Sequence, residues 1–80
     1  MQEIEKRVRD TVSAILGGTV DVDAMKPTDD LFGAGMTSHQ TVQVMLGIEY
    51  EFDIEFTDGD LIESTFATIA SMVRAVSART

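Results

Sequence analysis

Ser38 is the residue of this chain whose type and position are best suited to chemistry. It stands in the run DDLFGAGMTSHQTV, residues 29–42, where a glycine-containing stretch ends and a long amphipathic helix is expected to begin. A hydroxyl at the start of a helix lies beside unpaired backbone NH groups and at the positive end of the helix dipole. These features stabilise a phosphate. The Ser38 hydroxyl could therefore either cap the helix or carry a covalently attached phosphate.

The neighbouring Thr37 offers a second candidate for the cap. Thr37 and Gln40 match the capping-box pattern, in which each side chain bonds the other residue's backbone NH group. If Thr37 caps the helix, Ser38 occupies the first helical position and its hydroxyl stays free.

Other residues give little support for an enzyme or a metal site. His39 follows Ser38 directly, and neighbours on a helix point about 100° apart, so they do not form a base–nucleophile pair. Residues 53–60 resemble a calcium loop, but Gly59 is seventh where an EF-hand requires glycine sixth. No phosphate-binding lysine follows the glycines at 33 and 35. Because the chain has no cysteine, any thiol must come from outside.

The net charge of -8 is concentrated in the middle of the chain. The segment from Asp21 to Glu63 has eleven acidic residues and one basic residue, Lys26. This charge disfavours binding to nucleic acid and to an anionic membrane. It favours protein partners with basic docking surfaces, although solubility alone would also explain it.

The length of 80 residues predicts one domain, spanning 1–80. No apolar run approaches the roughly 20 residues that span a bilayer. The start, MQEIEKRVRD, lacks the apolar core of a signal peptide. We therefore expect a cytoplasmic monomer.

Helical periodicity predicts an all-α four-helix bundle with three main helices, one short helix and a long first loop. The first helix should run from about Glu3 to Leu16, ended by Gly17 and Gly18, before a loop over residues 19–37 that Leu31 and Phe32 anchor to the core. The second should begin at Thr37 or Ser38 and reach about Phe52, with its buried side formed by Val42, Met45, Ile48, Glu49 and Phe52.

The remainder should begin with an extended connector, residues 54–56, whose Ile54 and Phe56 point inward. Thr57 should cap a short helix that ends near Ile62 or Glu63. A final helix should extend from about Thr65 to Ala78.

With these elements in place, the chain resembles the acyl carrier protein family, which includes the peptidyl carrier domains. The resemblance begins with a signature that leads into the attachment serine: Asp30, Leu31, Phe32, Gly35 and Ser38. It continues at matching spacings along nearly the whole chain, through Val42, Glu49, Phe52, Ile54, Phe56, Phe66, Ile69 and Met72.

The resemblance implies a four-helix bundle with 4′-phosphopantetheine esterified to Ser38. A phosphopantetheinyl transferase would supply this arm from coenzyme A, and its thiol would hold an acyl or aminoacyl group as a thioester. The chain itself would have no catalytic residues and no metal.

Two departures from the family pattern bear on the partners. Most members have Asp-Ser-Leu at the attachment site, whereas this chain has Thr37, Ser38 and His39. Residues 38–48 also lack the acids that fatty-acid carriers have there. The pattern is more similar to stand-alone carriers of specialised pathways or those loaded by amino-acid ligases than to a housekeeping fatty-acid carrier.

We expect the loading ligase and downstream transferases to dock around Met36, His39, Gln43, Leu46 and Tyr50. The cargo, whether fatty acyl, polyketide or amino acid, stays open at this point. The alternative function is an unmodified helical protein-interaction adaptor.

Overall fold

The structure is a computed structural model that describes residues 2–79. Its main helices are α1 (Gln2–Leu16), α3 (Ser38–Phe52) and α5 (Ile69–Ser77), and its short helices are α2 (Leu31–Ala34) and α4 (Glu63–Phe66). Two 3₁₀ turns, Val22–Ala24 and Asp58–Asp60, lie in the connecting segments. The absence of strands within residues 2–79 confirms the predicted all-α class.

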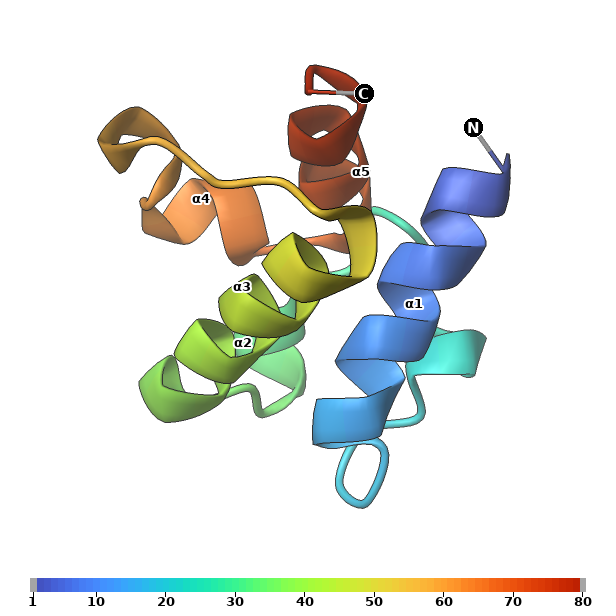
Figure 1. Cartoon of the computed structure of the whole chain (residues 1–80). Coiled ribbons are helices and arrows are strands. Elements are labelled where there is room, and N and C mark those ends of the chain that lie inside the picture. Colours follow the sequence, from blue (N-terminus) through green and yellow to red (C-terminus); the bar gives the residue numbers. More distant parts are fainter. Residues whose placement is uncertain (1, 80) are drawn as a thin grey trace.

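Helix α1 packs against both α3 and α5 (Figure 1). Its Val8, Val12 and Leu16, at four-residue spacing, are buried on the face that these helices cover. The same core contains buried apolar side chains from every other helix, including Leu31, Val44, Ile48, Phe66, Ile69, Met72 and Val76. The three main helices are therefore positioned by one shared core.

A glycine lets α1 and α3 approach closely. A Cβ atom at Gly47 of α3 would lie 2.9 Å from Cγ2 of Thr11 in α1. The Thr11 side chain is fixed, because its Oγ1 donates to the carbonyl oxygen of Arg7 at 2.9 Å. Gly47 thus sets the separation of the two helices at this contact.

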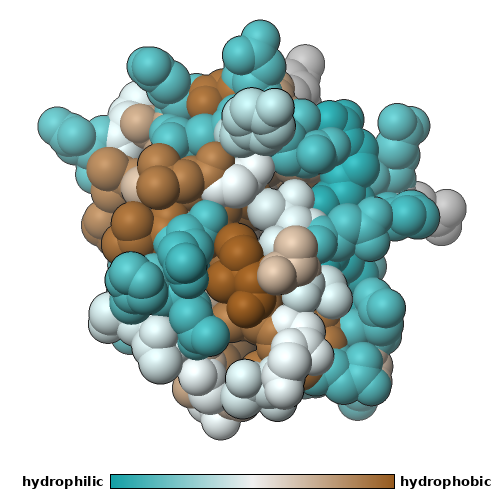
Figure 2. Space-filling model, turned by 60° about the horizontal axis from the view of Figure 1, so that its bottom comes forward, coloured by the Kyte–Doolittle hydropathy of each residue, from teal (hydrophilic) through white to brown (hydrophobic). Residues whose placement is uncertain are grey.

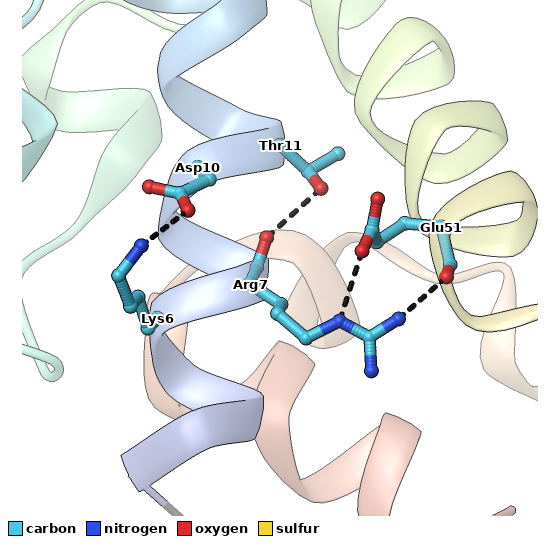
Figure 3. A network of polar contacts seen from close by, with 5 residues as sticks. All are labelled: Lys6, Arg7, Asp10, Thr11 and Glu51. Atoms are coloured by element: carbon cyan, nitrogen blue, oxygen red, sulfur yellow. Dashed lines mark hydrogen bonds and ion pairs between the residues drawn. The ribbon is translucent and has the colours of Figure 1, made fainter.

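Arg7 ties α1 to the C-terminal end of α3 (Figure 3). Its Nε is 2.9 Å from Oε2 of Glu51, and its second terminal nitrogen donates to the Glu51 carbonyl oxygen at 2.7 Å. The guanidinium also lies 4.3 Å from the ring centre of Phe52.

Figure 3 also shows the Lys6 ammonium group donating a hydrogen bond to the Asp10 carboxylate. This hydrogen bond and the negative charge of Asp10 raise the pKa of Lys6 above its ordinary value.

Arg79 makes an analogous set of contacts with the segment that follows α3. It forms an ion pair with Asp60, donates to the carbonyl oxygens of Glu55 and Ala75, and lies over the ring of Phe56. The two arginines therefore hold the connector between α3 and α4 near its two ends.

The connector has the predicted inward contacts. Phe56 is buried and meets Phe66 edge to face at 5.4 Å between ring centres. Ile54 packs against the core as well. Phe56 is held further by its backbone NH group, which donates to the Glu49 carboxylate at 2.8 Å.

The prediction of an irregular loop over residues 19–37 was wrong in part. The loop contains the turn Val22–Ala24 and helix α2. Asp30 caps α2 by accepting from the Phe32 backbone NH group at 3.0 Å, and Gly35 ends it with φ of 121°. The predicted anchoring is confirmed, because Leu31 is fully buried and Phe32 packs against the core.

The predicted helix boundaries after residue 57 were also wrong. Thr57 does begin a turn, and its backbone NH group and hydroxyl both donate to the Asp60 carboxylate, but this turn ends at Asp60. Residues 63–66 form the separate helix α4, and α5 begins at Ile69 rather than at Thr65. The physical reason is Thr68, which forms its own capping box with Ser71 and so starts a new helix.

The predicted buried side of α3 was wrong at Val42, which is 51% exposed. Val44, which was not predicted, is fully buried, and Ile48 is fully buried as expected. Met45 and Phe52 are partly buried against the core, as expected.

Among residues 2–79, no helix is long and apolar enough to cross a membrane.

Candidate functional site

Ser38 lies at the first position of α3, and Thr37 performs the capping. The Thr37 Oγ1 accepts from the Gln40 backbone NH group at 3.1 Å, and the Gln40 Oε1 accepts from that of Thr37 at 2.9 Å. This confirms the predicted capping box. The Ser38 side chain is exposed and forms no hydrogen bond with another described residue.

The surroundings of the Ser38 hydroxyl suit a phosphodiester. The backbone NH groups of Ser38 and His39 have no acceptor among residues 2–79, because they belong to the first turn of the helix. They are donors at the positive end of a 15-residue helix. The residues present therefore fit an attached, negatively charged phosphate.

Met36 is a correction to the predicted docking residues. It is only 4% exposed, because the backbone after Gly35 turns its side chain inward. Its backbone NH group donates to the carbonyl oxygen of Leu31 at 3.0 Å. Met36 thus fixes the loop before Ser38 and presents little surface to a partner.

The other predicted docking residues are exposed. Leu46 is 55% exposed and Tyr50 is 88% exposed, and His39 and Gln43 are also exposed. Val42, which was expected in the core, is exposed as well, and it stands four residues before Leu46 and eight before Tyr50. That spacing places the three on one side of a helix and was the signal that could have identified them.

A groove of about 630 Å³ adjoins Ser38, and we call it the site groove. Its walls come from α2, α3 and the segment that leads into α4, and its lining is Phe32, Met36, Thr37, Ser38, Thr41, Val42, Met45, Leu61, Ile62, Glu63 and Phe66. Most of these side chains are apolar. Leu61 and Ile62, a further pair that the sequence analysis missed, are exposed on the wall formed by that segment.

Apolar surface gathers on this part of the molecule. Figure 2 shows brown, apolar surface at the left of the face and near its centre, among teal and white side chains. Among residues 3–79, the large apolar side chains that are exposed are Val42, Leu46, Tyr50, Leu61 and Ile62. All of them belong to α3 or to the segment before α4.

The acidic middle segment is largely without basic partners. Two of its acids, Glu51 and Asp60, form ion pairs with Arg7 and Arg79, and the others form none with a described residue. Residues 38–48 of α3 contain no acid and no lysine or arginine. The site therefore combines the part of α3 that has no acid, lysine or arginine, residues 38–48, with acidic surface around it. Within residues 2–79, no group of three or more metal-ligating side chains could hold a metal ion.

The chain is similar in sequence to a family of phosphopantetheine-binding proteins and to two aminoacyl carrier proteins. The model of the family described as "Phosphopantetheine attachment site" matches residues 6–76. The aminoacyl carrier protein of Agrobacterium fabrum is 47% identical over 51 residues, which is 64% of this chain and only 61% of that protein's length. Aminoacyl carrier protein 1 of Bradyrhizobium diazoefficiens is 28% identical over 80 residues, covering 95% of this chain and 89% of that protein.

Two solved structures are similar in fold. One is the crystal structure of an engineered Bradyrhizobium japonicum glycine:[carrier protein] ligase complexed with carrier protein from Agrobacterium tumefaciens and ATP. A chain in it matches with a TM-score of 0.75 and 39% identity, over 89% of this chain and 97% of that chain. The corresponding complex with AMP gives a TM-score of 0.73 and 38% identity, over 86% and 97%.

The family match covers nearly the whole helical bundle, and its name fits the free hydroxyl at the start of α3. The chain belongs to the phosphopantetheine attachment site family, the family of the acyl and aminoacyl carrier proteins.

Proposed function

We propose that this chain is an aminoacyl carrier protein that holds its cargo as a thioester on a 4′-phosphopantetheine arm attached to Ser38. The observation that carries the proposal is the free, exposed Ser38 hydroxyl beside a capping box formed by Thr37 and Gln40. The aminoacyl cargo is supported by the names of the relatives. The chain would act as a carrier rather than an enzyme, because tethering alone raises the effective concentration of its cargo.

The arm would be attached by a phosphopantetheinyl transferase. The Ser38 Oγ forms a bond to the phosphorus next to the pantetheine of coenzyme A, and the bond from that phosphorus to the adenosine-bearing phosphate breaks. A base of the transferase takes the hydroxyl proton. The free NH groups of Ser38 and His39 are placed to stabilise the resulting phosphodiester.

The loading partner would be an amino-acid ligase, and downstream transferases would receive the cargo. Support for a ligase comes from the solved complexes of a glycine:[carrier protein] ligase with a carrier protein. We assign docking to a recognition face defined by His39, Val42, Gln43, Leu46 and Tyr50. This face has no acid, so shape and apolar contact should dominate recognition there, with the surrounding acids guiding approach.

Several further properties belong to the same proposal. The chain would act as a monomeric single domain. It would be located in the cytoplasm, where coenzyme A supplies the arm. It would bind neither nucleic acid nor membrane, given its net charge of -8. It would serve a specialised pathway rather than housekeeping fatty-acid synthesis, because Thr37 replaces the usual acid and residues 38–48 contain none.

Mass spectrometry after co-expression with a broad-specificity transferase tests the attachment. The protein should gain the mass of one phosphopantetheine, and Ser38→Ala should remove the gain completely. Ser64→Ala, which changes another exposed serine, should be modified like the wild type.

Loading with glycine by a glycine:[carrier protein] ligase tests the cargo. The holo-protein should form a glycyl thioester, and Ser38→Ala should not. An arm found on another residue would exclude Ser38 as the attachment site. If no transferase modifies the chain, and Ser38→Ala binds partners as well as wild type does, the chain is the unmodified adaptor.

A further inference from the structure

Two adjoining grooves lead away from Ser38. The site groove is lined by Ser38 and by mainly apolar side chains. A second groove of about 390 Å³ shares Phe32 and Glu63 with it and continues to Asp30, Ser64 and Ala67. Because the two grooves share Phe32 and Glu63, they meet at these residues and together form a path that begins beside Ser38.

The charged side chains on this path are all acidic. Glu63 lines both grooves and Asp30 lines the second, while no lysine or arginine lines either. Asp30 is engaged, since its Oδ1 accepts from the Phe32 backbone NH group. Glu63 forms no hydrogen bond or ion pair with another described residue. The Glu63 carboxylate is therefore available to a cation that enters the path.

We propose that the loaded arm folds back along these grooves and that Glu63 pairs with the protonated α-amino group of the aminoacyl thioester. This rests on the proposed attachment at Ser38. The apolar part of the arm covers side chains of the site groove, including Val42, Met45 and Ile62. Asp30 adds negative charge beyond Glu63 without giving up its capping bond.

The charge of the path selects the class of cargo. A cationic aminoacyl group is attracted, a neutral acetyl group loses the ionic contact, and an anionic malonyl group is repelled by two carboxylates. Glu63 is exposed, so the contact is weak and the arm exchanges between held and free positions. A weakly held arm remains available to a partner enzyme.

Hydrolysis rates of matched thioesters test this selection. A transferase can install glycyl, acetyl or malonyl arms on Ser38 from the corresponding coenzyme A thioesters. At about pH 6 an α-amino group is protonated, because its ordinary pKa is about 7.7–8.0. We expect Glu63→Gln to speed hydrolysis of the glycyl thioester by about two- to five-fold, the range of an exposed ion pair, and to leave the acetyl thioester unchanged.

Asp58→Asn is the matched control variant. It removes the same charge from the neighbouring 3₁₀ turn, but Asp58 lines neither groove. Both thioesters should hydrolyse on this variant as on wild type. If Glu63→Gln and Asp58→Asn change the glycyl rate equally, or if Glu63→Gln does not raise it, the inference is overturned.

Amide NMR shifts provide a second readout. Relative to the holo-protein, the glycyl arm should shift Phe32, Glu63 and Ser64, and the malonyl arm should leave them in place. Equal shifts with the glycyl, acetyl and malonyl arms would overturn the assignment of Glu63. Installation of the arm, verified by mass, keeps this outcome distinct from a failure of the proposed function, in which no arm is attached at all.

Discussion

The two halves of α3 differ in their exposure and in the residues that they contact. The site half, Ser38–Leu46, begins with a free hydroxyl, borders a groove and exposes Val42 and Leu46. The anchor half, Gly47–Phe52, touches α1 at Gly47 and is held by Arg7. One helix can therefore expose a free hydroxyl and apolar side chains along its first half because its second half is fixed against α1.

The largest expected difference between the halves is in stability. Ile48→Ala removes a fully buried side chain of the anchor half, and we expect a loss of about 2–5 kcal/mol in the free energy of unfolding. Val42→Ala, on a half-exposed residue of the site half, should cost under about 1 kcal/mol. Urea unfolding of the two variants measures both, and equal losses would contradict the comparison.

The contact between α1 and α3 predicts a smaller effect. Gly47→Ala improves helix propensity by about 1 kcal/mol, but the new Cβ atom meets Cγ2 of Thr11. Overpacking of this kind costs about 1–3 kcal/mol, so we expect a net loss. Because Thr11→Ser removes that methyl group, Gly47→Ala should become neutral or stabilising in its background. A double-mutant cycle by urea unfolding measures the coupling, and a loss that persists beside Ser at position 11 would exclude this cause.

Arg7 should contribute about 1–2 kcal/mol through its carbonyl, carboxylate and ring contacts. Arg7→Ala should lose this amount, and Arg7→Lys should recover only part, because lysine lacks the planar fork. Hydrogen exchange should show faster opening at the C-terminal end of α3 in Arg7→Ala. Faster exchange at Val44, inside the site half, to the same degree would show that the halves are not separate.

The smallest expected change in stability is at Leu46. Leu46→Ala should alter the free energy of unfolding by less than about 1 kcal/mol, because the side chain is mostly exposed. It should nevertheless lower kcat/KM for loading by a ligase about ten-fold if Leu46 contacts the partner. Thr19→Ala, an exposed change outside α3, should leave loading unaffected. Unchanged loading of Leu46→Ala would remove this residue from the recognition face.

The start of the site could be predicted because its signals are local. The capping box depends only on Thr37 and Gln40, and the positions of α1 and α3 follow from periodicity and glycine. On the buried side of α3 the prediction was wrong at Val42, because apolar residues lie on several sides of this helix and Val44 is buried instead. Which side is buried depends on where α1 lies, and that depends on a long-range contact at Gly47.

The segment from Thr57 to Thr68 was ambiguous for a different reason. Thr57, Thr65 and Thr68 are all acceptable helix caps, so composition alone does not choose among them. The structure uses Thr57 and Thr68 and leaves Leu61 and Ile62 exposed between them. Met36 was misplaced because the positive φ of Gly35 directs the following residue inward. The attachment at Ser38 stays a prediction that mass spectrometry decides.

The use of Thr37 as the cap separates modification from folding. If Ser38 capped α3, each removal of the arm would restore a structural bond and each attachment would break one, so the two forms would differ in stability. Because Thr37 and Gln40 form the cap, attachment or removal of an arm at Ser38 would leave the first turn of the helix unchanged. The proportion of modified chains would then be set by the enzymes that add and remove the arm. The unmodified chain would be as stably folded as the loaded one.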